Sequence, residues 1–159
     1  MDLTRALIES DEGNRSRKYQ DSLGHWTIGI GHNLDASLPC DAAKTIQTQA
    51  GLPLDDDWLP ATVDTQYEYD LKSNCGWLWQ RPWWSGANEA RQAALNDMGF
   101  NLGPKKAQAF VTFYGFCAAG DWKAAADDLE FHTAVAKQLP RRYGRLSQIL
   151  RTGSVKGLL

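Results

Sequence analysis

The chain has 159 residues, of which 43% are hydrophobic, 23% charged and 11% aromatic, and its formal net charge is −2. This composition excludes disorder as the main state, and the length suits one domain or two small lobes that share a helix. The longest run without a polar residue spans about eight residues, 113–120, against the ~20 that a membrane-spanning helix needs. The small net charge does not favour a nucleic acid partner.

In chain order, the apolar spacing at the N-terminus predicts a helix over residues 2–12 that ends at a glycine. Residues 17–32 predict a small antiparallel sheet, in which two strands flank a turn at 21–24. Gly29 and Gly31 in the second strand indicate a bulge, or a place where another group approaches the backbone closely. The N-terminal part of the chain is therefore expected to combine one helix with a short sheet.

The rest of the chain is predicted to be helical. Asp41 is expected to cap a helix that ends near Gly51, and a long helix begins at about residue 60 and is stopped by Pro82. The further helices are expected over 87–102, 106–119, 121–129 and 140–153. This order predicts an α+β fold.

The chain is predicted to form a single domain over residues 1–159, made of two lobes. Residues 14–59 form a small sheet lobe. The helix at 2–12 and the helices over 60–159 form a larger helical lobe, and the long helix joins the two lobes. The first helix is assigned to the helical lobe because three strands alone cannot bury a core.

Charge and cysteine content constrain the partners and the compartment. Residues 1–130 carry 11 basic and 19 acidic side chains, whereas residues 131–159 carry six basic and no acidic ones. This basic C-terminal segment either seeks an anionic surface or pairs with carboxylates elsewhere in the fold, and both interpretations stay open. Cys40, Cys75 and Cys117 show no disulfide framework, which suits a reducing compartment. The N-terminus shows no signal-peptide pattern.

Two carboxylates and a hydroxyl form the candidate catalytic set. Glu12 ends the first predicted helix, Asp21 lies in the turn nine residues later, and Thr27 follows on the opposing strand. Cleavage of a glycosidic bond needs a proton donor and a second group that assists the anomeric carbon, and two carboxylates in different environments can do both. By spacing alone this signal is weak, because surface carboxylate pairs are common.

The motifs around these residues resemble a known family. Glu12, Asp21 and Thr27, the last within Trp-Thr-Ile-Gly-Ile-Gly-His at 26–32, are similar to the active-site signature of the phage-type lysozymes, glycoside hydrolase family 24. Later segments resemble this family in the same order along the whole chain: Phe100-Asn101-x-Gly103, Asp121-Trp122-x-x-Ala125-Ala126, Pro140-x-Arg142-x-x-Arg145 and Arg151-Thr152-Gly153.

The resemblance implies a peptidoglycan muramidase that needs no cofactor and no metal. It would hydrolyse the β-1,4 bond between N-acetylmuramic acid and N-acetylglucosamine. Glu12 would be the general acid, Asp21 would stay ionised and stabilise the oxocarbenium-like transition state, and Thr27 would position the water.

The resemblance also implies three supporting residues. Arg142 would hold Glu12 in place, His32 would be structural and pair with Asp70 on the long helix, and Phe100 would line the substrate cleft. Other cleft positions depart from the family pattern, since this chain has Asn33, Phe113 and Asp128 there. Substrate detail therefore does not transfer from the family.

The leading interpretation is a monomeric phage or prophage endolysin with antibacterial, cell-lysing activity. It would fold in the host bacterial cytoplasm, reach the cell wall through a holin pore, and have peptidoglycan as its partner and no nucleic acid. The basic C-terminal segment would meet the anionic outer membrane. The alternatives are a lytic transglycosylase that uses Glu12 alone, a non-catalytic cell-wall-binding module, and a cysteine peptidase.

Two further clusters have simpler explanations. Trp77, Trp79, Trp83 and Trp84 suggest either a sugar-stacking or membrane-interface patch or a bulky core plug, and the core plug is favoured. The aspartates at 55–57 lack the spacing of a calcium loop, so a solvated turn is expected.

Overall fold

The computed structural model describes residues 2–21 and 23–159. Its contacts divide the chain into two compact units. We call Ile8–Ser73 the sheet unit, and the chain up to Leu7 together with Asn74–Leu159 the helical unit. The division falls inside the first helix and inside the long helix. The structure thus places residues 8–12 and 60–73 with the sheet, whereas the sequence prediction assigned them to the helical lobe.

The sheet unit begins with the end of α1 (Leu3–Glu12), followed by three antiparallel strands in the order β1-β2-β3. The strands are β1 (Arg15–Gln20), β2 (Trp26–Gly29) and β3 (His32–Asn33). In the register of β1 and β2, Tyr19 lies opposite Thr27. The predicted two-stranded hairpin is present, and a third short strand continues it.

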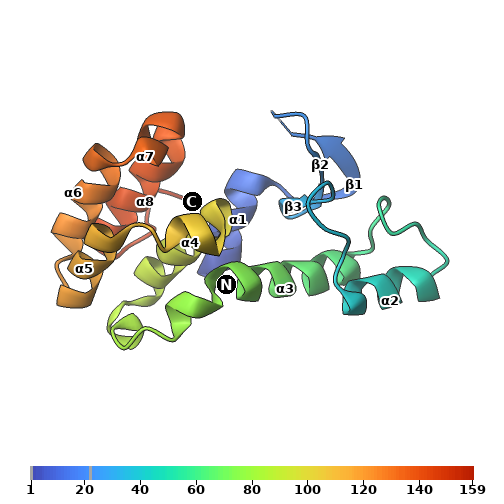
Figure 1. Cartoon of the computed structure of the whole chain (residues 1–159), viewed down its shortest axis with the longest axis horizontal. Coiled ribbons are helices and arrows are strands. Elements are labelled where there is room, and N and C mark those ends of the chain that lie inside the picture. The colour runs from blue at the N-terminus through green and yellow to red at the C-terminus, as the bar shows by residue number, and fades with distance from the viewer. Residues whose placement is uncertain (1, 22) are drawn as a thin grey trace. The chain divides into compact units, whose positions relative to one another are not determined.

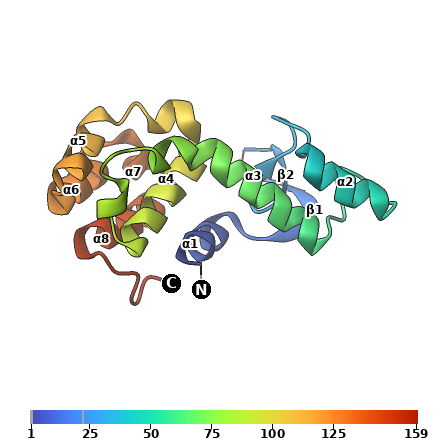
Figure 2. The ribbon, with the colours of Figure 1, turned by 90° about the horizontal axis from the view of Figure 1, so that it is seen from below.

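Two helices complete the sheet unit, α2 (Asp41–Gln49) and the N-terminal part of α3 (Pro60–Trp79) (Figure 2). The buried Gln47 links them, because its Oε1 accepts hydrogen bonds from the Leu59 N–H at 3.1 Å and from the Thr62 hydroxyl at 2.7 Å. The prediction that Asp41 caps α2 is wrong. Cys40 is the N-cap residue, and Asp41 already belongs to the first helical turn.

The aspartate run before α3 anchors the first strand. The Asp56 carboxylate accepts a hydrogen bond from the Lys18 N–H at 3.0 Å, and the Lys18 ammonium forms an ion pair with Asp55. Within residues 2–21 and 23–159, no cluster of acidic, histidine or cysteine side chains is arranged to hold a metal ion. The aspartates at 55–57 therefore form a turn that is hydrogen-bonded to β1.

The helical unit contains the helices that follow α3 (Figure 1): the 3₁₀ turn η1 (Trp84–Gly86), α4 (Glu89–Ala107), α5 (Val111–Ala119), α6 (Trp122–His132), α7 (Ala134–Gln138) and α8 (Pro140–Thr152). The last helix, α8, packs against α4, α6 and α7. Its fully buried side chains include Tyr143 and Leu146, and these meet a core to which Phe113 and Leu129 also belong.

Local signals placed most helix ends correctly. The Asp121 side chain accepts a hydrogen bond from the Ala124 N–H and caps α6, and α8 runs from Pro140 to the left-handed Gly153. The predicted stop at Gly103 is a kink, where φ is 70° and the helix resumes at once. The prediction of a single helix over residues 106–119 is wrong, because α4 ends at Ala107 and α5 begins at Val111.

The tryptophan cluster is not a core plug. Trp77, Trp83 and Trp84 are half-buried, and Trp79 is 38% exposed. Tyr114 organises this layer, since Trp77 meets its ring edge-on at 5.3 Å between centroids and Trp83 stacks on it at 6.2 Å. The interpretation of these tryptophans as a core plug is therefore wrong, and they form a half-buried aromatic layer instead.

The predicted α+β, lysozyme-like class is confirmed: a small antiparallel sheet is combined with a mainly helical remainder. Among the described residues, no helix has the length and apolar character needed to cross a bilayer.

Candidate active site

Glu12 is the last residue of α1, and the left-handed Gly13 follows it. Its side chain packs against the turn between β2 and β3. A Cβ on Gly31, where φ is +68°, would lie 3.1 Å from both the Cγ and Oε2 atoms of Glu12. The close approach that the sequence predicted at the glycines is confirmed here, and the approaching group is a candidate catalytic side chain.

Asp21 lies where β1 turns towards β2. Its Oδ1 atom accepts hydrogen bonds from the backbone N–H groups of Leu23 and His25, both at 2.8 Å. The bond from His25 is the largest cause that lowers the pKa of Asp21 below its usual range, and desolvation opposes it. Hydrogen bonds to a carboxylate favour the charged form. The loop therefore holds Asp21 as an anion.

Thr27 lies on β2 and is 6% exposed. Its hydroxyl donates a hydrogen bond to the backbone oxygen of His25 at 3.3 Å. Because the hydroxyl proton is directed at this carbonyl, the lone pairs of the same oxygen can accept a further hydrogen bond. Asp21 and Thr27 thus contact the same residue of the intervening loop.

Tyr19 connects Glu12 with this loop. Its hydroxyl donates to the Glu12 backbone oxygen at 3.3 Å, and the Arg15 guanidinium lies 4.2 Å above its ring centroid. Burial raises the pKa of Tyr19, Arg15 lowers it, and the carboxylates of Glu12 and Asp21 each raise it. Both candidate carboxylates therefore influence the pKa of the Tyr19 hydroxyl, which is bonded to the backbone of Glu12.

His32 pairs with Asp70 as predicted. His32 Nδ1 lies 2.9 Å from Asp70 Oδ2, and the side chains are 4% and 17% exposed. The second ring nitrogen lies 3.2 Å from the Ser37 backbone oxygen, and Gln66 donates to Asp70 at 2.9 Å. The predicted pairing is confirmed, and this cluster ties β3 to α3.

Arg142 lies in the helical unit, where its Nε donates to Asp97 Oδ1 at 2.8 Å. The Arg142 side chain is 9% exposed and the Asp97 side chain is fully buried. This ion pair joins α8 to α4. The expected support of Glu12 by Arg142 stays a prediction.

The basic C-terminal segment also forms ion pairs within the helical unit. Arg151 donates to Asp127 at 2.8 Å and to Glu130 at 2.9 Å, and these bonds raise the pKa of Arg151. Pairing with carboxylates elsewhere in the fold therefore accounts for Arg142 and Arg151. Three other basic residues of the segment are exposed: Lys137, Arg141 and Lys156.

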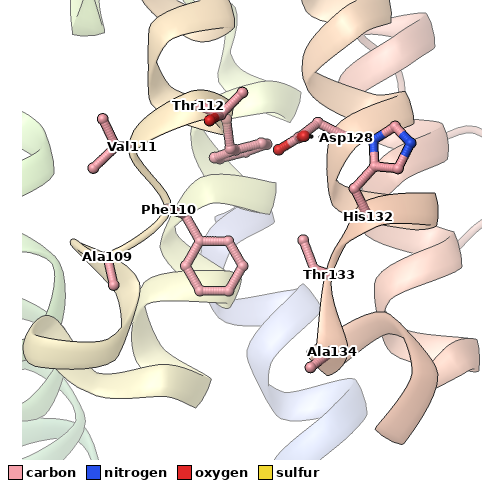
Figure 3. Close-up of a pocket in the computed structure, with 9 residues that line it drawn as sticks. Ala109, Phe110, Val111, Thr112, Asp128, His132, Thr133 and Ala134 are labelled. Carbon is pink, nitrogen blue, oxygen red and sulfur yellow. Dashed lines mark ion pairs between the residues drawn. The ribbon is translucent and has the colours of Figure 1, made fainter.

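Two of the positions that depart from the family pattern meet in a pocket of about 270 Å³ in the helical unit (Figure 3). Phe113 and Asp128 line it together with Phe110, Thr112 and neighbouring residues. Asp128 Oδ1 lies 3.6 Å from His132 Nδ1 across one turn of α6. The pocket combines aromatic carbon with a carboxylate, an imidazole and a hydroxyl. Phe100 is 9% exposed on α4, and its role in binding substrate stays a prediction.

The cysteines do not support a peptidase. Burial raises the pKa of Cys75 and of Cys117 to about 12. A cysteine nucleophile acts as the thiolate, which these thiols do not form near neutral pH. Cys40 is half-buried and serves as the N-cap residue of α2. The structure therefore argues against cysteine chemistry.

Three residues of this site were not identified as functional from the sequence. Tyr19 donates to the Glu12 backbone oxygen, His25 donates to Asp21 and Asp35 contacts His25, but a tyrosine in a strand and an exposed His–Asp pair are common in any protein. The Asn33-Leu34-Asp35 segment could have predicted the turn that positions Asp35, because asparagine and aspartate that follow a strand often form side-chain turns.

The α+β fold, a small antiparallel sheet combined with a mainly helical remainder, is consistent with a lysozyme-like protein. The comparison with known families agrees: the model of the phage lysozyme family matches residues 9–145. The chain belongs to the phage lysozyme family. This membership supports a lysozyme-like cell-wall hydrolase.

Individual proteins show the same similarity. The chain is 30% identical over 169 aligned residues to the pre-baseplate central spike protein Gp5 of Enterobacteria phage T4. The alignment covers 94% of this chain but only 28% of the length of that protein. The chain is 23% and 25% identical to two probable T4-type lysozymes of Dictyostelium discoideum, with 94% of each chain covered.

Proposed function

We propose that this protein is an endolysin with muramidase activity, which hydrolyses the β-1,4 bond between N-acetylmuramic acid and N-acetylglucosamine in peptidoglycan. Family membership and the lysozyme relatives support the reaction class. The observation that carries the proposal is the environment of Asp21. Two backbone N–H groups keep it anionic at the end of a hairpin whose other strand carries Thr27.

The three candidate residues divide the chemistry between them. Glu12 donates a proton to the leaving glycosidic oxygen, and the anion of Asp21 stabilises positive charge at the anomeric carbon. A water that donates hydrogen bonds to Asp21 and to the oxygen of Thr27 has a lone pair free to attack the anomeric carbon, and it passes a proton to the Asp21 carboxylate as the new C–O bond forms. The Thr27 hydroxyl is available as an acceptor because its own proton is directed at His25.

In the helical unit, the pocket of Figure 3 is proposed to hold part of the glycan strand. The Phe110 ring offers apolar surface to a sugar or an acetamido methyl group, while Thr112 and Asp128 offer hydrogen-bonding groups. Phe100, which does not line this pocket, is proposed to contact the substrate elsewhere in the helical unit. Mutations at Asp128 are then expected to raise KM more than they lower kcat.

The deciding experiment is mass spectrometry of the fragments released from purified peptidoglycan, with and without borohydride reduction. Reducible N-acetylmuramic acid ends support the muramidase. Anhydro ends would indicate a lytic transglycosylase and would remove the assigned role of Asp21. New amino termini would indicate a peptidase, and binding without any fragments would indicate a wall-binding module.

The same proposal covers where the protein acts. We expect it to fold as a monomer in the host bacterial cytoplasm and to reach the wall through a holin pore, which leads to host lysis. Expression in bacteria without a holin should leave the cells intact, and co-expression of a holin should lyse them. Spontaneous lysis without a holin would contradict this route.

The exposed cations at the C-terminus are proposed to meet the anionic outer membrane. The test is a triple variant in which Lys137, Arg141 and Lys156 become Gln, because these three side chains are exposed. Activity on purified peptidoglycan should stay unchanged, while activity against intact Gram-negative cells should fall. Equal activity of both proteins against intact cells would contradict the proposal.

A further inference from the structure

Within the sheet unit, one residue of the β1–β2 loop contacts both candidate catalytic residues of the hairpin. The His25 N–H donates to Asp21 Oδ1 at 2.8 Å, and the Asp21 N–H donates back to the His25 oxygen at 2.9 Å. The Thr27 hydroxyl donates to the same His25 oxygen at 3.3 Å. The separation of Asp21 and Thr27 therefore depends on where the His25 backbone lies.

Asp35 holds this backbone from the other side. Its Oδ2 atom accepts a hydrogen bond from the Trp26 N–H at 3.0 Å and lies 3.5 Å from His25 Nδ1. One carboxylate oxygen thus contacts the main chain of Trp26 and the side chain of His25. These two residues are the ones that separate the Asp21 turn from Thr27.

The contact replaces strand pairing that the short β3 cannot supply. β3 consists of His32 and Asn33 alone, which pair with Ile28 and Thr27. The Trp26 oxygen still finds a backbone partner, the Leu34 N–H at 2.8 Å. The Trp26 N–H would have no strand partner on that side, and the Asp35 carboxylate takes that place.

Asp35 is itself held in position before any substrate binds. The Asn33 side-chain oxygen accepts hydrogen bonds from the N–H groups of Asp35 at 2.9 Å and of Ala36 at 3.1 Å. This side-chain turn fixes the backbone from which the carboxylate projects. The Asp35 side chain is 46% exposed and that of His25 is 50% exposed. An exposed pair of this kind adds little to stability, so its effect is on geometry.

We propose that Asp35 is a positioning residue: it fixes the backbone of His25 and Trp26, and through them the spacing of Asp21 and Thr27 around the attacking water. The inference rests on the muramidase function proposed above. Asp35 touches no reacting atom in this account. Losing it would let the loop move, and small displacements of catalytic groups reduce kcat strongly.

The test compares Asp35→Ala with Asp35→Asn in the full chain. Asparagine keeps an oxygen that can accept the Trp26 N–H, whereas alanine does not. On purified peptidoglycan, Asp35→Ala should lower kcat roughly tenfold with KM within about twofold, and Asp35→Asn should keep kcat within about threefold. Asp41→Ala is the matched control, because its exposed carboxylate is bonded to Lys44 of its own helix. It should behave like the wild type.

Amide NMR provides a readout that does not depend on activity. The amide protons of Leu23 and His25 report the titration of Asp21, because both are bonded to it. In Asp35→Ala the titration midpoint seen at the His25 amide should rise, since the bond from His25 is the main cause of the lowered pKa of Asp21. In Asp35→Asn it should stay near the wild-type value.

Three results would overturn the proposal: wild-type kcat in Asp35→Ala, equal loss of kcat in the Asn and Ala variants, or a His25 amide whose titration does not change. A wild-type protein that releases no fragments from peptidoglycan would refute the muramidase instead. The amide titration would then still decide whether Asp35 positions the loop.

Discussion

The sheet unit contains two His–Asp pairs that differ in burial. His32 and Asp70 are 4% and 17% exposed with 2.9 Å between their atoms, whereas His25 and Asp35 are 50% and 46% exposed with 3.5 Å. The buried pair lies within a hydrogen-bonded cluster that joins a strand to a helix. The exposed pair lies beside the candidate catalytic loop. The same two residue types therefore stabilise the fold at one place and orient a loop at the other.

The difference follows from solvation. A buried hydrogen-bonded pair that loses one partner leaves a polar group in a medium that cannot solvate it, so breaking the pair costs about 1–3 kcal/mol. An exposed pair loses little, because water replaces the partner. We therefore expect that, within the sheet unit, substitutions at the catalytic loop lower activity with little loss of stability. Substitutions at the buried pair should lower stability instead.

The largest expected effect is on activity alone. Glu12→Gln should lower kcat at least about 100-fold because it removes the proton donor, while the melting temperature stays close to the wild-type value. Asp11→Asn on the same helix is the control, since Asp11 is exposed, and it should retain activity. Release of reducing ends from peptidoglycan measures both. A folded Glu12→Gln protein with near-normal activity would remove Glu12 from the mechanism.

The buried pair should show the reverse behaviour. His32→Ala and Asp70→Ala should each lower the free energy of unfolding by roughly 2–3 kcal/mol, because each leaves a buried polar partner behind. Urea denaturation measures this, and the double variant completes the cycle. The pair is coupled if the double variant loses clearly less than the sum of the two single losses. Additive losses would contradict the coupling.

Gly31→Ala is expected to affect both properties. The left-handed φ of +68° should cost about 1–2 kcal/mol in stability, and the new Cβ would press on Glu12. Gly51→Ala carries the same backbone strain at φ +70° but meets no atom within 4 Å. Both variants should therefore lose similar stability by urea denaturation. Only Gly31→Ala should lose activity, and equal activities would show that the contact with Glu12 does not matter.

The Asp21 loop predicts a pH dependence. The pKa of Asp21 is lowered in the folded protein, so its contribution to stability is present above the usual aspartate pKa of about 3.9 and is lost as pH falls through the folded value. The acid limb of kcat should accordingly lie below the ordinary aspartate range. A carboxyl ¹³C titration of Asp21 compared with the pH–rate profile measures this. A midpoint at or above the ordinary value would contradict the prediction.

The smallest effect is expected for stability at the exposed pair. His25→Ala and Asp35→Ala should each change the free energy of unfolding by no more than about 0.5 kcal/mol, as exposed ion pairs usually do. The same urea experiment that measures the His32 variants provides the direct comparison. A loss as large as that at His32 would show that the exposed pair is structural after all.

Much of the fold could be predicted because its signals are local. Asp2 accepts hydrogen bonds from the N–H groups of the first turn of α1, and Pro140 and Gly153 mark the two ends of α8. These signals act through hydrogen bonds and dihedral preferences over about four residues, which the sequence shows directly. The break between α4 and α5 was missed, since the sequence lacks a strong stop at 108–110.

The candidate catalytic residues were identified from the motif resemblance, whereas their environments were not. Nothing in the spacing of Asp21 indicates that the N–H groups of Leu23 and His25 keep it anionic. The sequence indicated that something approaches the backbone at Gly29 or Gly31, but it could not name Glu12 as the approaching group. Likewise Arg142 was recognised as a family position, while its buried partner Asp97 was not.

The sequence by itself therefore determined the α+β class, most helix ends, and the identity of Glu12, Asp21 and Thr27 as candidates. The tertiary structure alone decided which polar side chains are buried, that the tryptophans form a half-buried layer on Tyr114, and that Asp35 replaces a missing strand partner. The physical reason is the distance along the chain between the interacting residues. Helix ends depend on neighbours in the chain, whereas burial and loop geometry depend on groups that only folding brings together.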